Sequence, residues 1–171
     1  MHLLRSCDEL QRWRSQRRQQ GEHLHFVPTM GALHAGHQSL IRRAGQPTAE
    51  AEAPQVLVSV FVNPLQFSDL ADLERYPRPL SADLELLESA GCELAFTPSV
   101  VEMYPHHPSP PTSSVVVGGA ALGFEGGDRP GHFDGVATVL TVLFSLSGRC
   151  CAFMGEKDFQ QVAVTRQLVA E

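Results

Sequence analysis

The sequence predicts an α/β fold with a mainly parallel sheet. Two apolar runs, 24–27 and 56–62, have the length and apolar content of buried strands. Each ends in a segment rich in glycine, proline or amide side chains, and stretches with helical apolar spacing follow. Since strands and helices alternate along only 171 residues, we expect one domain whose ligands bind at the carboxyl ends of the strands.

The bulk composition excludes several classes of protein. Apolar residues make up 43% of the chain and the formal net charge is −6, which argues against broad nucleic-acid binding. The longest apolar run, 136–146, is too short to span a membrane. The N-terminus has no apolar signal core and the four cysteines show no framework spacing, so we expect a cytoplasmic protein with reduced thiols.

The first helix is predicted to begin at Ser6, because Ser6 and Glu9 fit a capping box. Gly21 is its predicted end. Arginines crowd the second half of this helix, where cations suit the helix dipole. We favour a solvated helix end, and a phosphate or nucleic-acid patch is the alternative. These arginines are Arg12, Arg14, Arg17 and Arg18.

The segment 28–37, PTMGALHAGH, joins the first strand to a helix. His34 and His37 share one face once the helix has begun, and Gly31 and Gly36 permit a close approach of the backbone to a ligand. Open N–H groups at a helix start attract anions, so the segment is a candidate phosphate clamp. The alternatives are an ordinary surface pair and a metal site, and zinc is disfavoured because no third ligand stands at a familiar spacing.

Two amide side chains, Asn63 and Gln66, follow the second strand. Because ligands bind at the carboxyl ends of strands, both are candidates for substrate binding. An Asn before a proline is equally a common loop starter, so turn formation is an even alternative for Asn63.

The middle of the chain predicts further elements. Leucines at helical spacing predict a helix over 80–90, ended by Gly91, and a strand over 93–97. Prolines exclude regular structure at 105–112, and 113–117 has the pattern of another short strand.

The segment 123–135, GFEGGDRPGHFDG, is predicted to be a glycine-rich loop. Such a loop can bring Arg129 and His132 to a ligand, or it can merely join two elements. The apolar run at 136–146 that follows fits a buried helix, although its Val and Thr content leaves a strand open.

A second strand–turn–helix junction lies near the end of the chain. The predicted strand 150–154 leads into Gly-Glu-Lys-Asp and then a helix. Lys157 offers a positive charge to phosphate. Asp158 can accept from ribose hydroxyls, or it can cap the helix with Gln161 in a D-x-x-Q capping box.

Several strings resemble one known family. HAGH at 34–37 resembles the HIGH signature of the nucleotidyltransferase superfamily, whose fold is Rossmann-like. The longer strings are similar to the pantoate–β-alanine ligases (pantothenate synthetases), and they occur in that family's order. They are PTMGALHAGH, VFVNPLQF at 60–67, YPRPL at 76–80, FTPSVVEMYP at 96–105, RPGHFDGVATV at 129–139 and GEKDFQQ at 155–161.

The resemblance implies ATP-dependent condensation of pantoate with β-alanine through pantoyl adenylate, releasing AMP and pyrophosphate. It implies catalytic roles for His37, His34 and Lys157, and Mg²⁺ with Asp83 as the candidate ligand. The implied ATP-binding residues are Met30, Gly31, His34, Gly36, His37, Gly155, Glu156, Lys157 and Asp158. The implied residues for pantoate and β-alanine are Gln66, Gln161, Asn63 and His132.

The resemblance also implies what the chain lacks. The chain ends at Glu171, before the family's second, Ser-rich signature and its small C-terminal domain. We therefore expect 1–171 to be the ATP- and pantoate-binding domain of a longer protein, dimeric when whole and weakly active or inactive alone. Another HIGH-type nucleotidyltransferase and a non-catalytic nucleotide-binding module are the alternatives.

Overall fold

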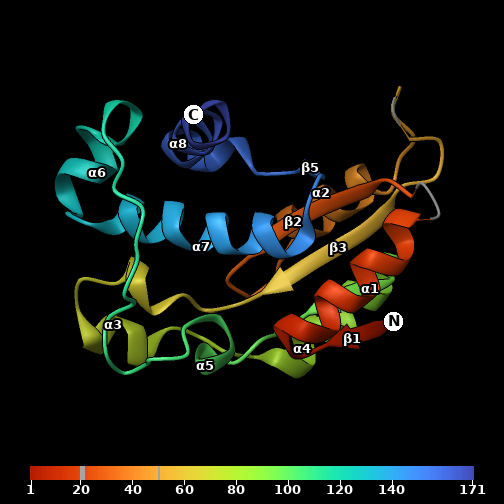
Figure 1. The fold of residues 1–171 in the computed structure, drawn as a ribbon, viewed down its shortest axis with the longest axis horizontal. Helices are drawn as coiled ribbons and strands as arrows, with labels where there is room; N and C mark the ends of the chain where they lie inside the picture. The colour runs from red at the N-terminus through yellow and green to blue at the C-terminus, as the bar shows by residue number, and fades with distance from the viewer. Residues whose placement is uncertain (20–21, 50) are drawn as a thin grey trace.

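The computed structural model describes residues 1–19, 22–49 and 51–171, so the predicted helix end at Gly21 lies outside the described residues, as does the side chain of Arg18. Among the described residues, five strands form one sheet in the order β1-β4-β3-β2-β5, and every pairing is parallel (Figure 1). The predicted parallel α/β fold is therefore confirmed. The strands are β1 His2–Leu4, β2 Leu24–Thr29, β3 Gln55–Val60, β4 Leu94–Phe96 and β5 Cys151–Ala152.

The pairing register brings the chemistry to one edge of the sheet. β2 lies between β3 and β5, with Thr29 opposite Val60 and Phe26 opposite Ala152. The segments that leave β2, β3 and β5 therefore start at the same edge. The chain adds strands on one side of β2 and then crosses to the other with β5, which makes this edge a topological switch point, where ligands bind in open α/β sheets.

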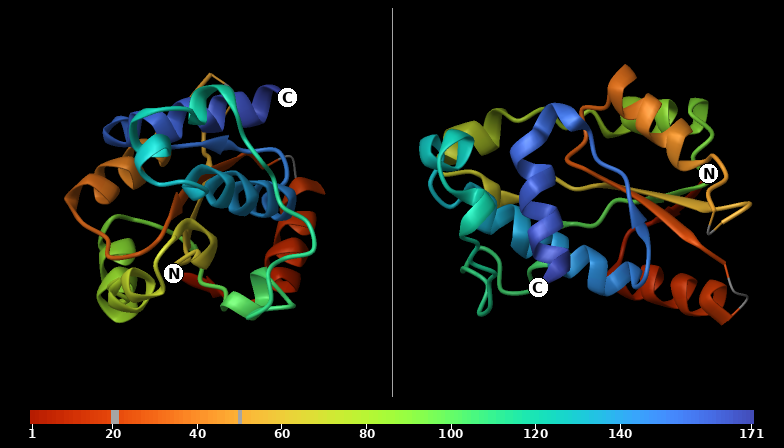
Figure 2. Two further views of the ribbon diagram at one scale, coloured as in Figure 1. Left: turned by 90° about the vertical axis from the view of Figure 1, so that its left-hand side faces the viewer. Right: turned by 90° about the horizontal axis from the view of Figure 1, so that it is seen from above.

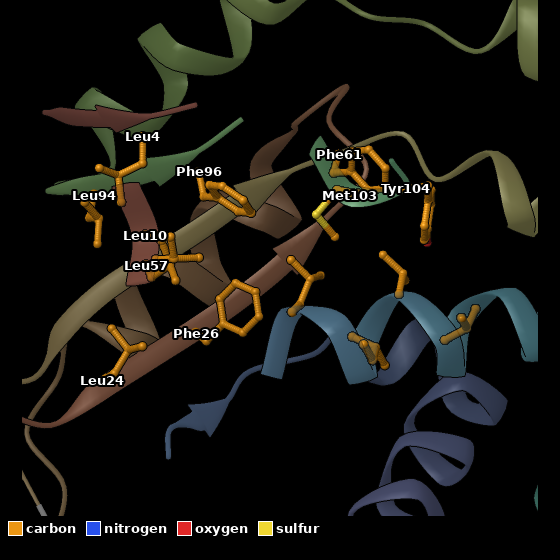
Figure 3. Close-up of a cluster of buried hydrophobic side chains, with 14 of the residues drawn as sticks. Leu4, Leu10, Leu24, Phe26, Leu57, Phe61, Leu94, Phe96, Met103 and Tyr104 are labelled. Atoms are coloured by element: carbon orange, nitrogen blue, oxygen red, sulfur yellow. The ribbon is translucent and has the colours of Figure 1, made fainter. Parts of the chain in front are cut away.

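Helices cover both faces of the sheet, as Figure 2 shows. Phe26, Leu57 and Phe96 belong to the cluster that packs against α1 and α7, and Figure 3 shows these side chains on one side of the strands. The adjacent Val27 and Val58 belong to the cluster that packs against α2 and α4. All five side chains have 0% exposure. Successive side chains of a strand point to opposite faces of the sheet, so each strand contributes to both hydrophobic cores. The longer helices are α1 Cys7–Gln19, α2 Ala35–Ala44, α4 Leu80–Ser89, α7 His132–Ser147 and α8 Phe159–Ala170.

The first helix begins as predicted, because Ser6 and Glu9 exchange capping hydrogen bonds of 3.1 Å. The prediction of a solvated arginine cluster is wrong for Arg14, which is buried. Its guanidinium donates to the carbonyl oxygens of Ser147 and Arg149, at 2.8 Å each. Arg14 therefore joins α1 to the end of α7 and to the segment that leads into β5.

Two expectations for the middle of the chain are wrong. The segment 113–117 forms no strand, because its backbone pairs with side chains of α7 instead of another strand. Val115 N–H donates to Thr138 Oγ1 and Val117 N–H to Asp134 Oδ1, each at 2.9 Å. The segment 123–135 is not entirely a loop, because a short helix, α6 Phe124–Asp128, forms within it, and α7 begins at His132.

Helix α7 resolves the choice between helix and strand at 136–146 in favour of helix. It contains Gly135, where an added Cβ would overlap the carbonyl of Leu65. The missing side chain lets α7 approach the 3₁₀ turn η1, Pro64–Gln66, which carries one of the predicted amides. The remaining short elements are α3 Leu70–Arg75, α5 Val100–Met103, η2 Gly119–Ala121 and η3 Glu156–Asp158. No described helix has the length and apolar content that a membrane crossing requires.

Candidate active site

A cavity of about 630 Å³ lies at the carboxyl edge of the sheet. Both strand–turn–helix junctions, η1, α6, α7 and the start of α8 contribute to its wall. Two of the predicted site residues, Asn63 and Asp83, do not line it. The predicted residues that do are Met30, Gly31, His34, Gly36, His37, Gln66, His132, Gly155, Glu156, Lys157, Asp158 and Gln161.

The turn after β2 has an uncommon backbone. Gly31 has φ +81 and Ala32 has φ +51, a left-handed conformation that costs free energy for an L-residue with a Cβ. The turn is held by Asp83 of α4, which receives hydrogen bonds from Ala32 N–H at 3.0 Å and from Leu33 N–H at 2.7 Å. A Cβ on Gly31 would lie 2.9 Å from Asp83 Oδ2, so glycine is required there for space as well as for φ.

Asp83 does not fit the predicted role of Mg²⁺ ligand. Its side chain is 2% exposed and both carboxylate oxygens already accept backbone hydrogen bonds. Within the described ranges, no cluster of three or more His, Cys, Asp or Glu residues could hold a metal. The structure therefore places Asp83 behind the turn, as the group that fixes its conformation.

His34 and His37 cap the start of α2. Gly36 N–H donates to His34 Nδ1 at 3.1 Å, and His34 N–H donates to His37 Nδ1 at 3.3 Å. Because each Nδ1 accepts a hydrogen bond, the neutral rings carry their proton on Nε2, which is thereby left as a hydrogen-bond donor. Burial, followed by the nearby His34, lowers the pKa of His37 below its ordinary 6.5 and favours this neutral form.

A chain of hydrogen bonds fixes the orientation of Gln66, which is 6% exposed. Leu65 N–H and the Tyr104 hydroxyl donate to Asn63 Oδ1, at 3.2 and 2.9 Å. Asn63 Nδ2 in turn donates to Gln66 Oε1 at 3.0 Å and to the carbonyl of Gly135 at 3.0 Å. Gln66 Oε1 is thus an acceptor, which leaves its Nε2 amide as a donor for a ligand.

Asn63 is 0% exposed, and both the Nδ2 donor and the Oδ1 acceptor of its side chain are hydrogen-bonded within the protein. It therefore holds Gln66 in place and does not itself reach the cavity. The turn-forming alternative accounts for Asn63, since its side chain caps η1.

His132 has the opposite tautomer to His34 and His37. Its Nδ1 lies 3.0 Å from the carbonyl of Gln66, and a carbonyl can only accept, so Nδ1 carries the proton. Nε2 is then an acceptor and lies 3.5 Å from Arg129 Nη1 and 3.6 Å from Glu125 Oε1. Burial lowers the pKa of His132, which keeps the ring neutral in this arrangement.

The junction after β5 is less constrained. The Lys157 side chain is 86% exposed and its Nζ lies 3.5 Å from Asp158 Oδ1. Asp158 occupies the N-cap position of α8, but its side chain makes no capping hydrogen bond, so the predicted D-x-x-Q capping box is absent. Gln161 lies in the first turn of α8 and reaches the same cavity as Gln66.

Sequence reasoning missed several residues of the cavity wall. Glu125 was hidden because its glycine-rich surroundings conceal a helix, although its i, i+4 spacing to Arg129 was a usable signal. Tyr76 lay within a matched string without an assigned role. The apolar part of the wall comes from the segment after β3, α2, α7 and the β5 segment: Phe61, Leu40, Val136, Val139, Leu140, Leu143 and Met154.

Comparison with known proteins agrees with this geometry. Residues 2–171 match the profile of the family described as Pantoate-beta-alanine ligase. The pantothenate synthetase of Stutzerimonas stutzeri is 48% identical over 171 residues, which are 100% of this chain and 58% of that protein. The one from Granulibacter bethesdensis is 50% identical, with 57% of its length covered.

Solved structures give the same assignment. The pantothenate synthetase from Thermus thermophilus matches with TM-score 0.86 and 44% identity, over 99% of this chain and 57% of that one. The pantoate-beta-alanine ligase from Francisella tularensis, complexed with Beta-gamma ATP and Beta-alanine, matches with TM-score 0.89 and 36% identity, over 99% of this chain and 62% of that one. The chain thus spans a little under two thirds of its relatives' length, and over that span it belongs to the pantoate–β-alanine ligase family.

Proposed function

We propose that this chain carries the ATP and pantoate site of an enzyme that condenses pantoate with β-alanine through pantoyl adenylate. The observation that carries the proposal is the shared cavity: the histidine turn, the Lys157 turn and the two glutamines Gln66 and Gln161 all line it. A nucleotide triphosphate and a small hydroxy acid can therefore meet there, in a volume typical of small-molecule sites.

In the first step, the pantoate carboxylate attacks the α-phosphorus of ATP and pyrophosphate leaves. Negative charge gathers on the phosphates, and donors already aimed at that charge lower the barrier. The Nε2–H groups of His34 and His37 supply such donors, because the caps of α2 hold both rings in the required tautomer. Lys157 adds a positive charge, and the start of α2 adds its open N–H groups.

The glutamines bind and orient the acid. Gln66 offers Nε2 as a donor, since its Oε1 is already paired with Asn63. Neutral amides suit a small polyol acid, and they reject analogues without the hydroxyl because a buried amide would be left unpaired. In the second step, the amine of β-alanine attacks the acyl carbon of the adenylate and AMP leaves.

Asp83 does not fit the role of a Mg²⁺ ligand, and within the part of the chain that the structure describes no cluster of three or more His, Cys, Asp or Glu residues could hold the ion. Phosphate oxygens of the nucleotide are the hard ligands that Mg²⁺ prefers. The steps above are accordingly assigned to protein groups alone.

For the whole protein, the resemblance supports a cytoplasmic homodimer with a further small domain after this one. We infer that the 171-residue chain alone binds ATP weakly and turns over poorly, because its relatives are longer.

The decisive experiment is ATP–pyrophosphate exchange catalysed by the whole protein. Exchange that requires pantoate and proceeds without β-alanine supports the adenylate mechanism. Exchange that requires a phosphate ester instead supports another HIGH-type nucleotidyltransferase, and thermal shifts with pantoate, nicotinamide nucleotides and pantetheine phosphate separate the acceptors. Binding of ATP without any exchange supports a non-catalytic module.

A further inference from the structure

Strand β5 is shorter than its sequence predicts. The apolar run covers 150–154, yet only Cys151 and Ala152 pair with β2 as a strand. Phe153, which follows, still donates its N–H to the carbonyl of Phe26 at 2.8 Å. Aromatic residues such as Phe153 favour strands. The composition of β5 therefore does not explain why the pairing stops, and the cause lies in the neighbouring strand.

The neighbouring strand carries a proline at the position where the pairing stops. In a parallel pair, every second residue of β2 directs its N–H and C=O groups toward β5. Phe26 is such a residue, because its carbonyl accepts from Phe153 N–H, and residue 28 is the next. Residue 28 is Pro28, which has no N–H to donate to the Phe153 carbonyl and places a ring carbon there instead. β2 is therefore a central strand as far as Val27 and becomes an edge strand at Pro28.

The pairing on the other side of β2 continues past the proline. Pro28 lies opposite Ser59, and Thr29 lies opposite Val60. Phe61 N–H donates to the carbonyl of Thr29 at 3.1 Å, and Thr29 Oγ1 donates to the carbonyl of Ser59 at 2.6 Å. The sheet thus opens on one side of β2 only, between β2 and β5.

This opening coincides with the cavity. Residues from both sides of the split line the cavity wall: Pro28, Thr29 and Met30 from the β2 side, and Met154, Gly155 and Glu156 from the β5 side. Paired strands lie about 4.8 Å apart, which leaves no room for a ligand between them. A ladder that continued beyond Ala152 would therefore close the crevice and draw the histidine turn toward the Lys157 turn.

Resting on the proposed function, we propose that Pro28 is a positioning residue for ATP, because its missing N–H keeps β2 and β5 apart. The nucleotide then enters between the two turns without first breaking a backbone hydrogen bond. A residue with an N–H at this position would let the strands pair in the free protein. Only the fraction of molecules with an open crevice would then bind, and the apparent affinity would fall by that fraction.

The test uses Pro28→Ala in the whole protein, which supplies the missing N–H. We expect the Kd for ATP, measured by isothermal titration calorimetry, to rise by about fivefold, the population shift that one backbone hydrogen bond supports. Pantoate-dependent exchange at saturating ATP should stay within about twofold of wild type, because the groups that act on the phosphates are unchanged. The new amide at position 28 should be protected from hydrogen exchange in the free protein and should lose that protection when ATP binds.

Two further proteins separate the missing donor from other effects of proline. Pro47→Ala is the matched control, because Pro47 is exposed, precedes β3 at the opposite edge of the sheet and does not line the cavity. It measures the general effect of replacing proline, which acts on the unfolded chain. A second variant carries lactic acid at position 28, whose ester has no N–H, and it should bind ATP as the wild type does.

An unchanged Kd for ATP in Pro28→Ala overturns the proposal. An equal rise in the lactic acid variant also overturns it, because the ring of Pro28 and not the missing donor would then matter. So does a Pro28→Ala protein that is less stable to urea than Pro47→Ala, since an added hydrogen bond should not destabilise the sheet. Absence of pantoate-dependent exchange in the wild type would instead refute the proposed function, and the titration with ATP would still test the crevice.

Discussion

The turn after β2 and the turn after β5 face one cavity, yet hydrogen bonds fix the first along its length, whereas the second lacks a side-chain cap. In the first turn, Thr29 Oγ1 accepts from Gly31 N–H at 3.2 Å, Asp83 accepts from the next two N–H groups, and the histidines close the helix start. In the second, Asp158 makes no capping bond and Lys157 extends into solvent.

The difference teaches that two similar strand–turn–helix segments can contribute to one site in different ways. Groups that are fixed in advance stabilise developing charge without reorganisation, and this suits the histidines to the transition state. A flexible cation must lose side-chain entropy when it binds, so part of its interaction energy is offset. We infer that the first turn supplies preorganised donors and the second supplies charge that becomes ordered with the nucleotide.

The largest expected effect comes from the preorganised turn. His37→Ala should slow pantoate-dependent exchange. The transition state should lose about 2–4 kcal/mol of stabilisation, the scale of one lost oxyanion-type donor. Steady-state and single-turnover kinetics of the whole protein measure this loss. His23→Ala is the control, because His23 is exposed and precedes β2 at the opposite edge of the sheet. An unchanged kcat in His37→Ala would remove the catalytic assignment.

The second-largest effect is expected from Asp83, whose carboxylate fixes the turn after β2. Asp83→Asn keeps the shape but replaces one acceptor oxygen with an amide donor, so Ala32 N–H or Leu33 N–H loses its partner. The free energy of unfolding should fall by about 1–3 kcal/mol, the penalty for a buried unsatisfied group, and exchange should slow as the turn loosens. Urea denaturation measures the first effect. Glu85→Gln, an exposed change on the same helix, should leave both quantities unchanged. A fully stable Asp83→Asn protein would mean that the turn does not depend on this carboxylate.

Much of the fold was accessible from the sequence, because the apolar runs at 24–27 and 56–62 and the leucines at helical spacing are local signals. The conformation of 113–117 was not accessible. Its composition is typical of a strand, but its backbone bonds to side chains of α7, which come near only in the folded chain. The three-residue β1 was missed because it is too short to show a period.

The candidate site likewise has residues that the sequence predicts and residues whose contacts only the structure shows. The histidine turn, the two glutamines and Lys157 were predicted from the sequence and line the cavity, although their roles remain proposals. The resemblance implied Asp83 only as a candidate Mg²⁺ ligand, and its hydrogen bonds to the turn after β2, about fifty residues away, could not be read from the sequence. The sequence placed Asn63 at the correct strand end. Only the structure shows that its side-chain amide is hydrogen-bonded to Gln66, Gly135 and Tyr104.

A smaller effect is expected from pH. The neutral form of His37 accepts the His34 N–H bond, and its lowered pKa means that protonation occurs below 6.5. At pH 6.5, exchange should therefore be reduced by less than about twofold, with a steeper loss at lower pH. The folded pKa is below the unfolded value, so the corresponding stability is present above pH 6.5 and is lost as pH falls to the folded pKa. A pH–rate profile whose acidic midpoint lies above 6.5 would contradict this assignment.

The smallest expected effect concerns the second turn and decides whether the comparison holds. Asp158→Ala should change the free energy of unfolding by less than about 0.5 kcal/mol, because no capping bond is lost. Its exposed contact with Lys157 adds little to stability. Asp69→Ala is the matched control: Asp69 caps α3 by accepting from Ala71 N–H at 2.9 Å, so its loss should cost about 1 kcal/mol. Equal losses in the two variants, measured by urea denaturation, would show that Asp158 caps α8 in solution. The second turn would then be as ordered as the first, and the contrast between a preorganised and an induced half of the site would fail.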